Sequence, residues 1–317
     1  MINRRQFGLT LGAAATFALT PRLFVGAEQK LITRAIPSSG ERIPIVGLGT
    51  SATFAQLARG EDKAALREVL KTFVERGATV LDTAPAYGAA EEVAGTLAKE
   101  LGVEKKIFWA TKVNVAPRGE DAKADPAAAR AQIEKSFAHL GVPKIDLIQV
   151  HNVADVATQL GVLKELKKEG RVRYIGVTTS SDSQYARLID VMRNEPLDFI
   201  GIDYAVDNRG IEETILPLAR ERKIGVLVYL PFGRTRLFRR VEGKALPEWA
   251  ADFDAKTWAQ FFIKYVASHP AVTSVTPATT KVTHLLDNLG AGIGRLPDEA
   301  TRKRMAEFVD ALPVTAS

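Results

Sequence analysis

The chain has 317 residues, of which 46% are hydrophobic and 25% are charged, and this composition is typical of a folded globular protein. It contains no cysteine, which excludes disulfides, thiolate catalysis and cysteine-ligated metal sites, and its four histidines leave little room for a histidine-rich metal cluster. The formal net charge of +6 is too small and too dispersed to indicate a nucleic-acid partner. We therefore expect neither a metal ion nor a nucleic acid in its function.

The first segment along the chain has the features of an export signal. Arg4 and Arg5 stand directly before Gln6 and Phe7, and a weakly apolar run covers residues 8–20. With 13 residues this run is shorter than the ~20 that a membrane-spanning helix needs. Paired arginines before such a run resemble a twin-arginine signal.

This resemblance divides the chain into a signal peptide, residues 1–27, and a mature domain, residues 28–317, because small residues precede Glu28. It implies export by the twin-arginine translocase, a periplasmic location and no stable membrane span in the mature form. The lack of cysteine fits an oxidising compartment. Two alternatives remain, an unprocessed N-terminal anchor and a basic tail in which the arginine pair arose by chance.

Short apolar runs at fairly regular intervals predict eight strands separated by helices. A short hairpin is expected first, over residues 31–43 with its turn at 38–40. The runs that follow cover residues 43–48, 79–82, 107–111, 145–150, 174–177, 199–202, 225–229 and 272–275. Runs without polar interruption suit parallel strands that are buried on both faces, and the stretches between them are long enough for a helix and a crossover.

Eight such units without a break in composition favour one α/β domain, a (β/α)8 or TIM barrel, with a closing helix over residues 297–311. An open, doubly wound sheet is the alternative. It is disfavoured because no Gly-x-Gly-x-x-Gly turn follows the first strand.

Polar side chains follow three adjacent strands of this expected barrel. Asp82 and Tyr87 come after the second strand, Lys112 after the third and His151 after the fourth. Active sites of such barrels gather at the carboxyl ends of the strands, so we expect these four side chains to meet. Each alone has a structural explanation, such as a helix cap, an ion pair or a buried imidazole. The occurrence of all four at the ends of adjacent strands is harder to explain by structural roles alone.

The chemistry of this set favours the reduction of a carbonyl group. Asp82 and Lys112 are expected to form a buried ion pair. The ammonium beside Tyr87 is expected to lower the pKa of the phenol and make it a better proton donor, while a neutral His151 orients a carbonyl oxygen. None of these side chains delivers hydride, so a nicotinamide cofactor must supply it.

Seven segments of the chain resemble the aldo-keto reductases, in order and over about residues 31–290. They are GLGT at 47–50, LDTAPAYG at 81–88, ATK at 110–112, DLIQVHN at 146–152, YIGV at 174–177, VYLPFG at 228–233 and TTKVTHLLDN at 279–288. The resemblance implies reduction of a small aldehyde or ketone to an alcohol with NADPH or, less often, NADH. It also implies that Tyr87 is the general acid, that Asp82 and Lys112 tune it, and that His151 orients the substrate.

The resemblance implies a cofactor site as well, which this chain matches less closely. The residues implied in cofactor binding are Gly49, Thr50, Asp82, Thr178, Thr179, Tyr229, Leu230, Phe232, Arg234, Thr280, Lys281, His284, Asp287 and Asn288. Thr178 and Thr179 stand where the family has Ser-Asn, and Gly201 stands where it has Gln, so the usual partners of the nicotinamide carboxamide are missing. Tyr229 is retained at the position that stacks on the nicotinamide ring.

The part of the site implied for the phosphates and the adenine also differs. His284 stands where an Arg commonly meets the 2′-phosphate, and Lys281 remains as a point charge, whereas Asp287 and Asn288 fit the adenine-contacting pair. The resemblance therefore favours NADP and leaves NAD possible. Residues 234–240 contain four arginines. This segment could fold over the pyrophosphate of the cofactor, or it could equally be a basic surface loop exposed to solvent.

Two other functions stay open beside an exported carbonyl reductase. In the first, the barrel keeps a bound nucleotide but serves as a redox-sensing or partner-binding module without significant turnover, which the altered carboxamide site motivates. In the second, it is a cofactor-free isomerase or hydrolase in which Tyr87 and Lys112 transfer protons. The cofactor features between Tyr229 and Asn288 argue against this last interpretation.

Overall fold

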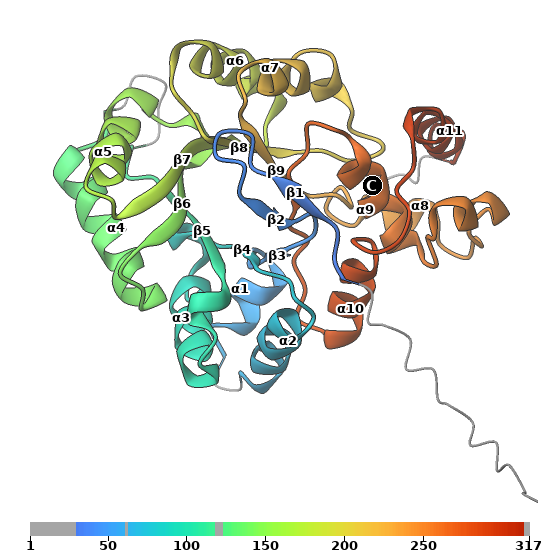
Figure 1. Cartoon of the computed structure of the whole chain (residues 1–317), viewed down its shortest axis with the longest axis horizontal. Coiled ribbons are helices and arrows are strands. Elements are labelled where there is room, and N and C mark those ends of the chain that lie inside the picture. The colour runs from blue at the N-terminus through green and yellow to red at the C-terminus, as the bar shows by residue number, and fades with distance from the viewer. Residues whose placement is uncertain (1–29, 61–62, 118–122, 314–317) are drawn as a thin grey trace, which may run out of the picture.

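Eight parallel strands lie side by side and close into a barrel in a computed structural model of the chain (Figure 1). The structure describes residues 30–60, 63–117 and 123–313, so the proposed signal peptide and its boundary at residue 27 lie outside the described residues. The sheet runs in the order β10, β9, β8, β7, β6, β5, β4, β3, and bridges from Val46 to Val275 and from Gly49 to Ala278 close it. The (β/α)8 barrel predicted from the sequence is confirmed.

The strand bounds agree with the apolar runs except at the first strand. The barrel strands are β3 (Leu48–Gly49), β4 (Val80–Asp82), β5 (Phe108–Val113), β6 (Ile145–Val150), β7 (Val172–Thr179), β8 (Phe199–Asp203), β9 (Gly225–Tyr229) and β10 (Ser274–Val275). The predicted strand 43–48 is wrong as a unit, because Ile43 and Pro44 pair within the hairpin, whereas Val46 bridges to Val275 and Leu48 pairs with Leu81 in the barrel. An apolar run in a sequence indicates that its residues are buried, but it does not show which strand they pair with. Two short strands that follow each other directly are therefore predicted as one.

The predicted N-terminal hairpin is confirmed. Its strands β1 (Thr33–Ala35) and β2 (Arg42–Pro44) pair antiparallel, and Figure 1 shows them across one end of the barrel. Ile36 and Ile43 are buried against the apolar side chains inside the barrel, among them Phe108 and Phe199. The hairpin therefore seals the end of the barrel opposite the carboxyl ends of the strands.

Helices cover the outside of the sheet (Figure 1). They are α1 (Thr53–Leu57), α2 (Ala64–Glu75), α3 (Ala90–Leu101), α4 (Pro126–Leu140), α5 (Val156–Lys168), α6 (Tyr185–Asn194), α7 (Ile215–Glu221), α8 (Arg236–Arg240), α9 (Trp258–Ser268), α10 (Val282–Gly290) and α11 (Glu299–Asp310). The closing helix predicted over 297–311 is α11, and its Met305 and Val309 are buried. Within the described ranges, none of the helices combines the length and the apolar character needed to cross a bilayer.

Alternation along the strands separates the barrel interior from the helix-facing core. In β5, Phe108 and Ala110 lie among the apolar side chains inside the barrel, whereas Trp109 belongs to the core under the helices. Because successive side chains of a strand point to opposite faces, Lys112 faces inward above Ala110. The same rule carries Gln149 inward above Leu147 in β6. The interior therefore has an apolar layer near the hairpin and a polar layer at the carboxyl ends.

A pair of glycine substitutions tests the packing of the helices. A Cβ at Gly95 in α3 would collide with the His139 carbonyl oxygen and lie 2.7 Å from the Leu140 Cα, both backbone atoms of α4. We expect Gly95→Ala to lower the free energy of unfolding by about 1–3 kcal/mol. Gly161→Ala in α5 meets nothing within 4 Å, and we expect it to raise that free energy by about 0.5–1 kcal/mol.

Urea unfolding of the two variants beside the wild type measures both changes. Equal effects of the two substitutions would contradict the close approach of α3 and α4.

Candidate active site

A pocket of about 600 Å³ opens at the carboxyl ends of the barrel strands. Asp82, Tyr87, Lys112 and His151 all line it, so the structure brings together the four side chains that were predicted to meet. They come from different elements: Asp82 ends β4, Tyr87 ends the short 3-10 helix Pro85–Tyr87, Lys112 lies within β5, and His151 follows β6 directly.

A buried ion pair forms the base of this group. The Lys112 Nζ atom lies 2.8 Å from each carboxylate oxygen of Asp82 and donates a further hydrogen bond of 2.9 Å to the Thr83 carbonyl oxygen. Lys112 is 1% exposed and Asp82 is 3% exposed, so neither charge has water to stabilise it. Burial opposes the charge of Lys112, but Asp82 and then Tyr87 outweigh it and raise the pKa of Lys112 above its usual value. Lys112 is therefore an ammonium.

The Tyr87 phenol lies next to this ammonium. The Lys112 Nζ atom is 5.1 Å from the centre of the Tyr87 ring. The three hydrogens of the ammonium face three nearer acceptors, the two Asp82 carboxylate oxygens and the Thr83 carbonyl oxygen, so Lys112 acts on the phenol chiefly through its positive charge. The Tyr87 and His151 rings meet edge to face, with their centres 6.0 Å apart. The phenol and the imidazole thus border the same part of the pocket.

The expected fall in the pKa of Tyr87 is not what this structure shows. Burial of the phenol raises its pKa above the usual value, and the lowering effects of Lys112 and Arg234 do not offset burial and the nearby Asp82 carboxylate. The sequence shows the neighbouring ammonium but not the depth at which the phenol lies, and desolvation disfavours the phenolate. Tyr87 is consequently a neutral proton donor in the protein without ligands.

His151 is a second neutral donor. Its burial, and then the repulsion from Lys112, lower the pKa of the imidazole to about 3. The imidazole is therefore uncharged near neutral pH, as the sequence interpretation expected. An uncharged ring carries one N–H, which can donate to a carbonyl oxygen without adding a positive charge next to Lys112.

Several of the residues implied in cofactor binding line the same pocket. These are Gly49, Asp82, Thr178, Thr179, Tyr229, Leu230, Phe232 and Arg234. Thr50 is fully buried beside them, and its hydroxyl has no hydrogen-bond partner among the described residues. Thr280, Lys281, His284, Asp287 and Asn288 do not line this pocket. Ala278 lines the pocket, and the chain continues from it through Thr280 and Lys281 into α10.

Two of these side chains have structural partners of their own. The Asp287 carboxylate accepts hydrogen bonds from Thr257 (2.8 and 3.0 Å) and Gln260 (2.9 Å), which ties α10 to the start of α9. The Thr179 hydroxyl donates to the Gln184 side-chain oxygen at 2.6 Å and accepts from the Ser181 amide. Thr179 is thus engaged within its own turn rather than aimed into the pocket.

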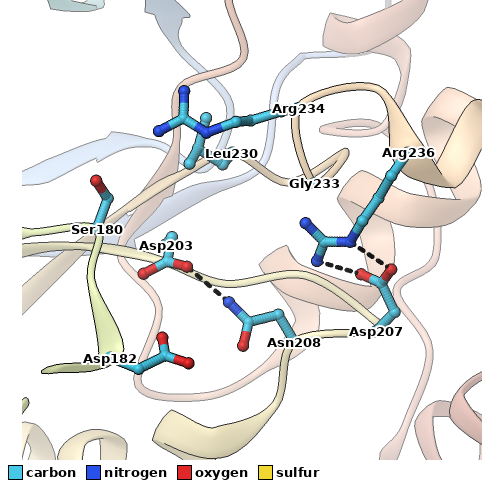
Figure 2. Close-up of a pocket in the computed structure, with 9 residues that line it drawn as sticks. All are labelled: Ser180, Asp182, Asp203, Asp207, Asn208, Leu230, Gly233, Arg234 and Arg236. Carbon is cyan, nitrogen blue, oxygen red and sulfur yellow. Dashed lines mark hydrogen bonds and ion pairs between the residues drawn. The ribbon is translucent and has the colours of Figure 1, made fainter. Parts of the chain in front are cut away.

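The basic loop after β9 is a mixture of paired and pocket-lining arginines. Figure 2, a close-up of a second pocket whose lining shares Ser180, Leu230 and Arg234 with the catalytic pocket, shows Arg236 bound through two hydrogen bonds to Asp207, each 2.8 Å long, whereas Arg234 lies apart from this pair. Arg240 donates to the carbonyl oxygens of Val309, in the last turn of α11, and of Leu312, which follows this helix. Only Arg234 of the four arginines lines the catalytic pocket.

Sequence reasoning missed Gln149. It is fully buried in β6, and its side-chain oxygen accepts a hydrogen bond of 2.9 Å from the Tyr229 hydroxyl. A signal existed: Gln149 is a polar residue inside an apolar run and stands two positions before His151, which predicts the same face of the strand. The sequence showed Gly201 only as the absence of the Gln that the family has at this position, and did not show that the Tyr229 ring occupies the space beside it.

The arrangement as a whole can donate a proton to an oxygen atom. Two uncharged donors, Tyr87 and His151, border one part of the pocket, and an ammonium behind Tyr87 can stabilise the phenolate that remains after proton transfer. In the described ranges, no three histidine, aspartate or glutamate side chains are grouped so that they could hold a metal ion.

Comparisons with known proteins agree with this geometry. The sequence model described as "Aldo/keto reductase family" matches residues 45–306. A probable aldo-keto reductase 1 from Glycine max is 30% identical over 286 residues, which cover 78% of this chain and 79% of that protein.

Solved structures share the fold. The holo form of the aldo-keto reductase AKR11C1 from Bacillus halodurans has a TM-score of 0.70 and 21% identity, covering 90% of this chain and 98% of that one. A Klebsiella pneumoniae aldo-keto reductase in complex with NADPH also has a TM-score of 0.70 and 21% identity, covering 91% of this chain and 98% of its own. The match over residues 45–306 shows that the chain belongs to the aldo/keto reductase family and is an oxidoreductase.

Proposed function

We propose that this oxidoreductase reduces an aldehyde or ketone to an alcohol with NADPH, and that Tyr87 supplies the proton. The observation that carries the proposal is the contact between the Tyr87 phenol and a buried ammonium at the wall of an open pocket. A neutral His151 on the same wall supports it, because carbonyl reduction needs a second donor to orient the oxygen.

The residues present fit a nicotinamide nucleotide. The Tyr229 ring offers a flat surface in the pocket, and Asn152, Thr178 and Ser180 line the wall beside Thr179 with amide and hydroxyl groups. Arg234 at the rim and Lys281 at the start of α10 would hold phosphates. The bound nucleotide would supply the hydride. NADPH is proposed over NADH because of these cations and because NADPH is named for the Klebsiella pneumoniae structure.

The chain's own residues have separate tasks in this reaction. His151 donates a hydrogen bond to the carbonyl oxygen and orients it beside Tyr87. When hydride reaches the carbonyl carbon, the C=O double bond becomes a single bond and its oxygen takes the proton from the Tyr87 hydroxyl. Lys112 stabilises the phenolate that remains, and water returns a proton to it. Asp82 keeps Lys112 charged in the buried site throughout.

We further propose that the protein is exported to the periplasm by the twin-arginine translocase. Arg4 and Arg5 before a short apolar run support this, as does the small-residue segment ending at Ala27. Twin-arginine export carries folded proteins, so a reductase could leave the cytoplasm with its nucleotide already bound.

Removing the Tyr87 hydroxyl tests the proton donor. We expect Tyr87→Phe to lower kcat/KM for aldehydes and ketones by about 10²–10⁴-fold, since a positioned acid contributes that much. Quenching of protein fluorescence by NADPH should remain, because the aromatic ring stays. Tyr185→Phe is the matched control: it also removes a tyrosine hydroxyl, one that donates to Asp203 and lies outside the catalytic group, so activity should not change.

A wild type that binds NADPH but is as slow as Tyr87→Phe with every carbonyl in a broad panel would instead favour a redox-sensing or partner-binding module. A wild type that binds no nicotinamide nucleotide would exclude both functions.

The pH profile of reduction tests the protonation states. The pKa of His151 is lowered to about 3 and that of Tyr87 is raised above its usual ~10, so neither group titrates in between. We expect kcat/KM for a non-ionising carbonyl substrate to be flat between about pH 5 and 9. An inflection near pH 6.5 that disappears in His151→Gln would show that this imidazole titrates normally.

Cell fractionation tests the proposed location. We expect Arg4→Lys combined with Arg5→Lys to remove the protein from the periplasmic fraction and to leave a longer precursor in the cytoplasm, because the arginine pair is the feature that the translocase recognises. Arg22→Lys, in the same segment but outside the pair, is the control and should export normally. Export of the double variant at the wild-type level would count against the twin-arginine route.

A further inference from the structure

Tyr229 reaches across the barrel from β9 to the opposite strands. Its hydroxyl lies 2.9 Å from the side-chain oxygen of Gln149 in β6 and 3.2 Å from the Asp82 Oδ1 atom in β4. The Lys112 Nζ atom is 5.0 Å from the centre of the Tyr229 ring and 5.1 Å from that of Tyr87. The ammonium is therefore in contact with two tyrosine rings, only one of which is the proposed proton donor.

A glycine makes this position of Tyr229 possible. A Cβ on Gly201 in β8 would collide with the Tyr229 hydroxyl and lie 2.6 and 2.7 Å from the Cε2 and Cζ atoms of its ring. Any side chain at residue 201 would occupy the space that the phenol now fills. Tyr229 can therefore take its inward position only because residue 201 has no side chain.

The Tyr229 hydroxyl has one proton and two acceptors. Gln149 donates through its nitrogen to the Val177 carbonyl oxygen at 3.4 Å, which directs its oxygen toward Tyr229. The Gln149 oxygen is nearer, at 2.9 Å against 3.2 Å, whereas the Asp82 carboxylate is charged and is the stronger acceptor, so the two share the hydroxyl proton. Burial, and then the Asp82 carboxylate, raise the pKa of Tyr229 well above its usual value, so the hydroxyl keeps its proton and remains a donor.

We propose that Tyr229 is a positioning residue for proton transfer, because its hydroxyl, placed by Gly201 and Gln149, holds the Asp82 carboxylate that aims the Lys112 ammonium at Tyr87. Asp82 Oδ1 accepts hydrogen bonds from both Lys112 and Tyr229, so rotation of the carboxylate would disturb both of these bonds. This inference rests on the proposed carbonyl reduction and adds a function for the hydroxyl that is independent of the flat face of the ring.

The charged and titratable groups around the donor come from every side of the pocket. They are Asp82 from β4, Lys112 from β5, His151 after β6, Tyr229 from β9 and Arg234 in the loop after β9. Of these, Lys112 and Tyr229 donate hydrogen bonds to the Asp82 carboxylate, and Tyr229 is the uncharged one, so loss of its hydroxyl changes the carboxylate without removing a charge.

Kinetics of Tyr229→Phe test the positioning function. We expect kcat for carbonyl reduction to fall about 3- to 10-fold, which corresponds to the loss of one buried hydrogen bond. We also expect the solvent deuterium isotope effect on kcat to rise, because a less well aligned donor makes proton transfer slower relative to hydride transfer. A purely structural function would leave this isotope effect unchanged, as should the control Tyr185→Phe.

Gly201→Ala gives a second, independent variant. Because its Cβ displaces the Tyr229 hydroxyl, it should reproduce the fall in kcat and the higher isotope effect. In the double variant with Tyr229→Phe, Gly201→Ala should lower kcat by a smaller factor than it does alone, since both substitutions act through the same hydroxyl.

A double-mutant cycle on stability measures the contact without any activity. Urea unfolding of Tyr229→Phe, Asp82→Asn and the double variant should show that the two changes are not additive. Additive effects, or a Tyr229→Phe enzyme with normal kcat and isotope effect, would overturn the inference while the proposed function stands. A wild type without carbonyl reductase activity would overturn both.

Discussion

The catalytic group depends on one buried ion pair. Asp82 and Lys112 both face the interior of the barrel, where a lone charge is costly and a paired one needs all of its hydrogen bonds. Lys112 donates to both Asp82 oxygens and to the Thr83 carbonyl oxygen, and this holds its ammonium 5.1 Å from the centre of the Tyr87 ring. The hydrogen bonds that keep Lys112 charged in the buried interior therefore also place its ammonium beside the proposed proton donor, Tyr87.

Desolvation, rather than charge alone, sets the protonation of the site. Burial raises the pKa of Tyr87 and lowers that of His151, so both groups are neutral donors in the absence of ligands. The Lys112 ammonium stabilises a phenolate only once it forms, which restricts its electrostatic benefit to the later part of the reaction. An enzyme built in this way keeps its acid protonated over a wide range of pH and still assists the loss of that proton.

The sequence predicted the features that depend on local pattern and missed those that depend on long-range packing. Apolar runs gave the eight strands and strand alternation gave the polar layer, so Asp82, Lys112 and His151 could be placed at one mouth. The division of residues 43–48 between the hairpin and β3 could not be read, because it depends on which strand pairs with which. The burial of Tyr87 and the position of Tyr229 beside Gly201 could not be predicted either, because both depend on side chains that are distant in the sequence.

The basic loop after β9 shows why a charge pattern does not define a binding site. Two of its arginines are held in place: Arg236 binds Asp207 after β8, and Arg240 binds the Val309 carbonyl oxygen in α11, the C-terminal helix that lies beside α8 in Figure 1. A loop held in this way needs little ordering when a ligand binds, so less binding free energy is lost. The paired arginines thus act on the pocket indirectly, because they fix the loop that places Arg234 at the rim.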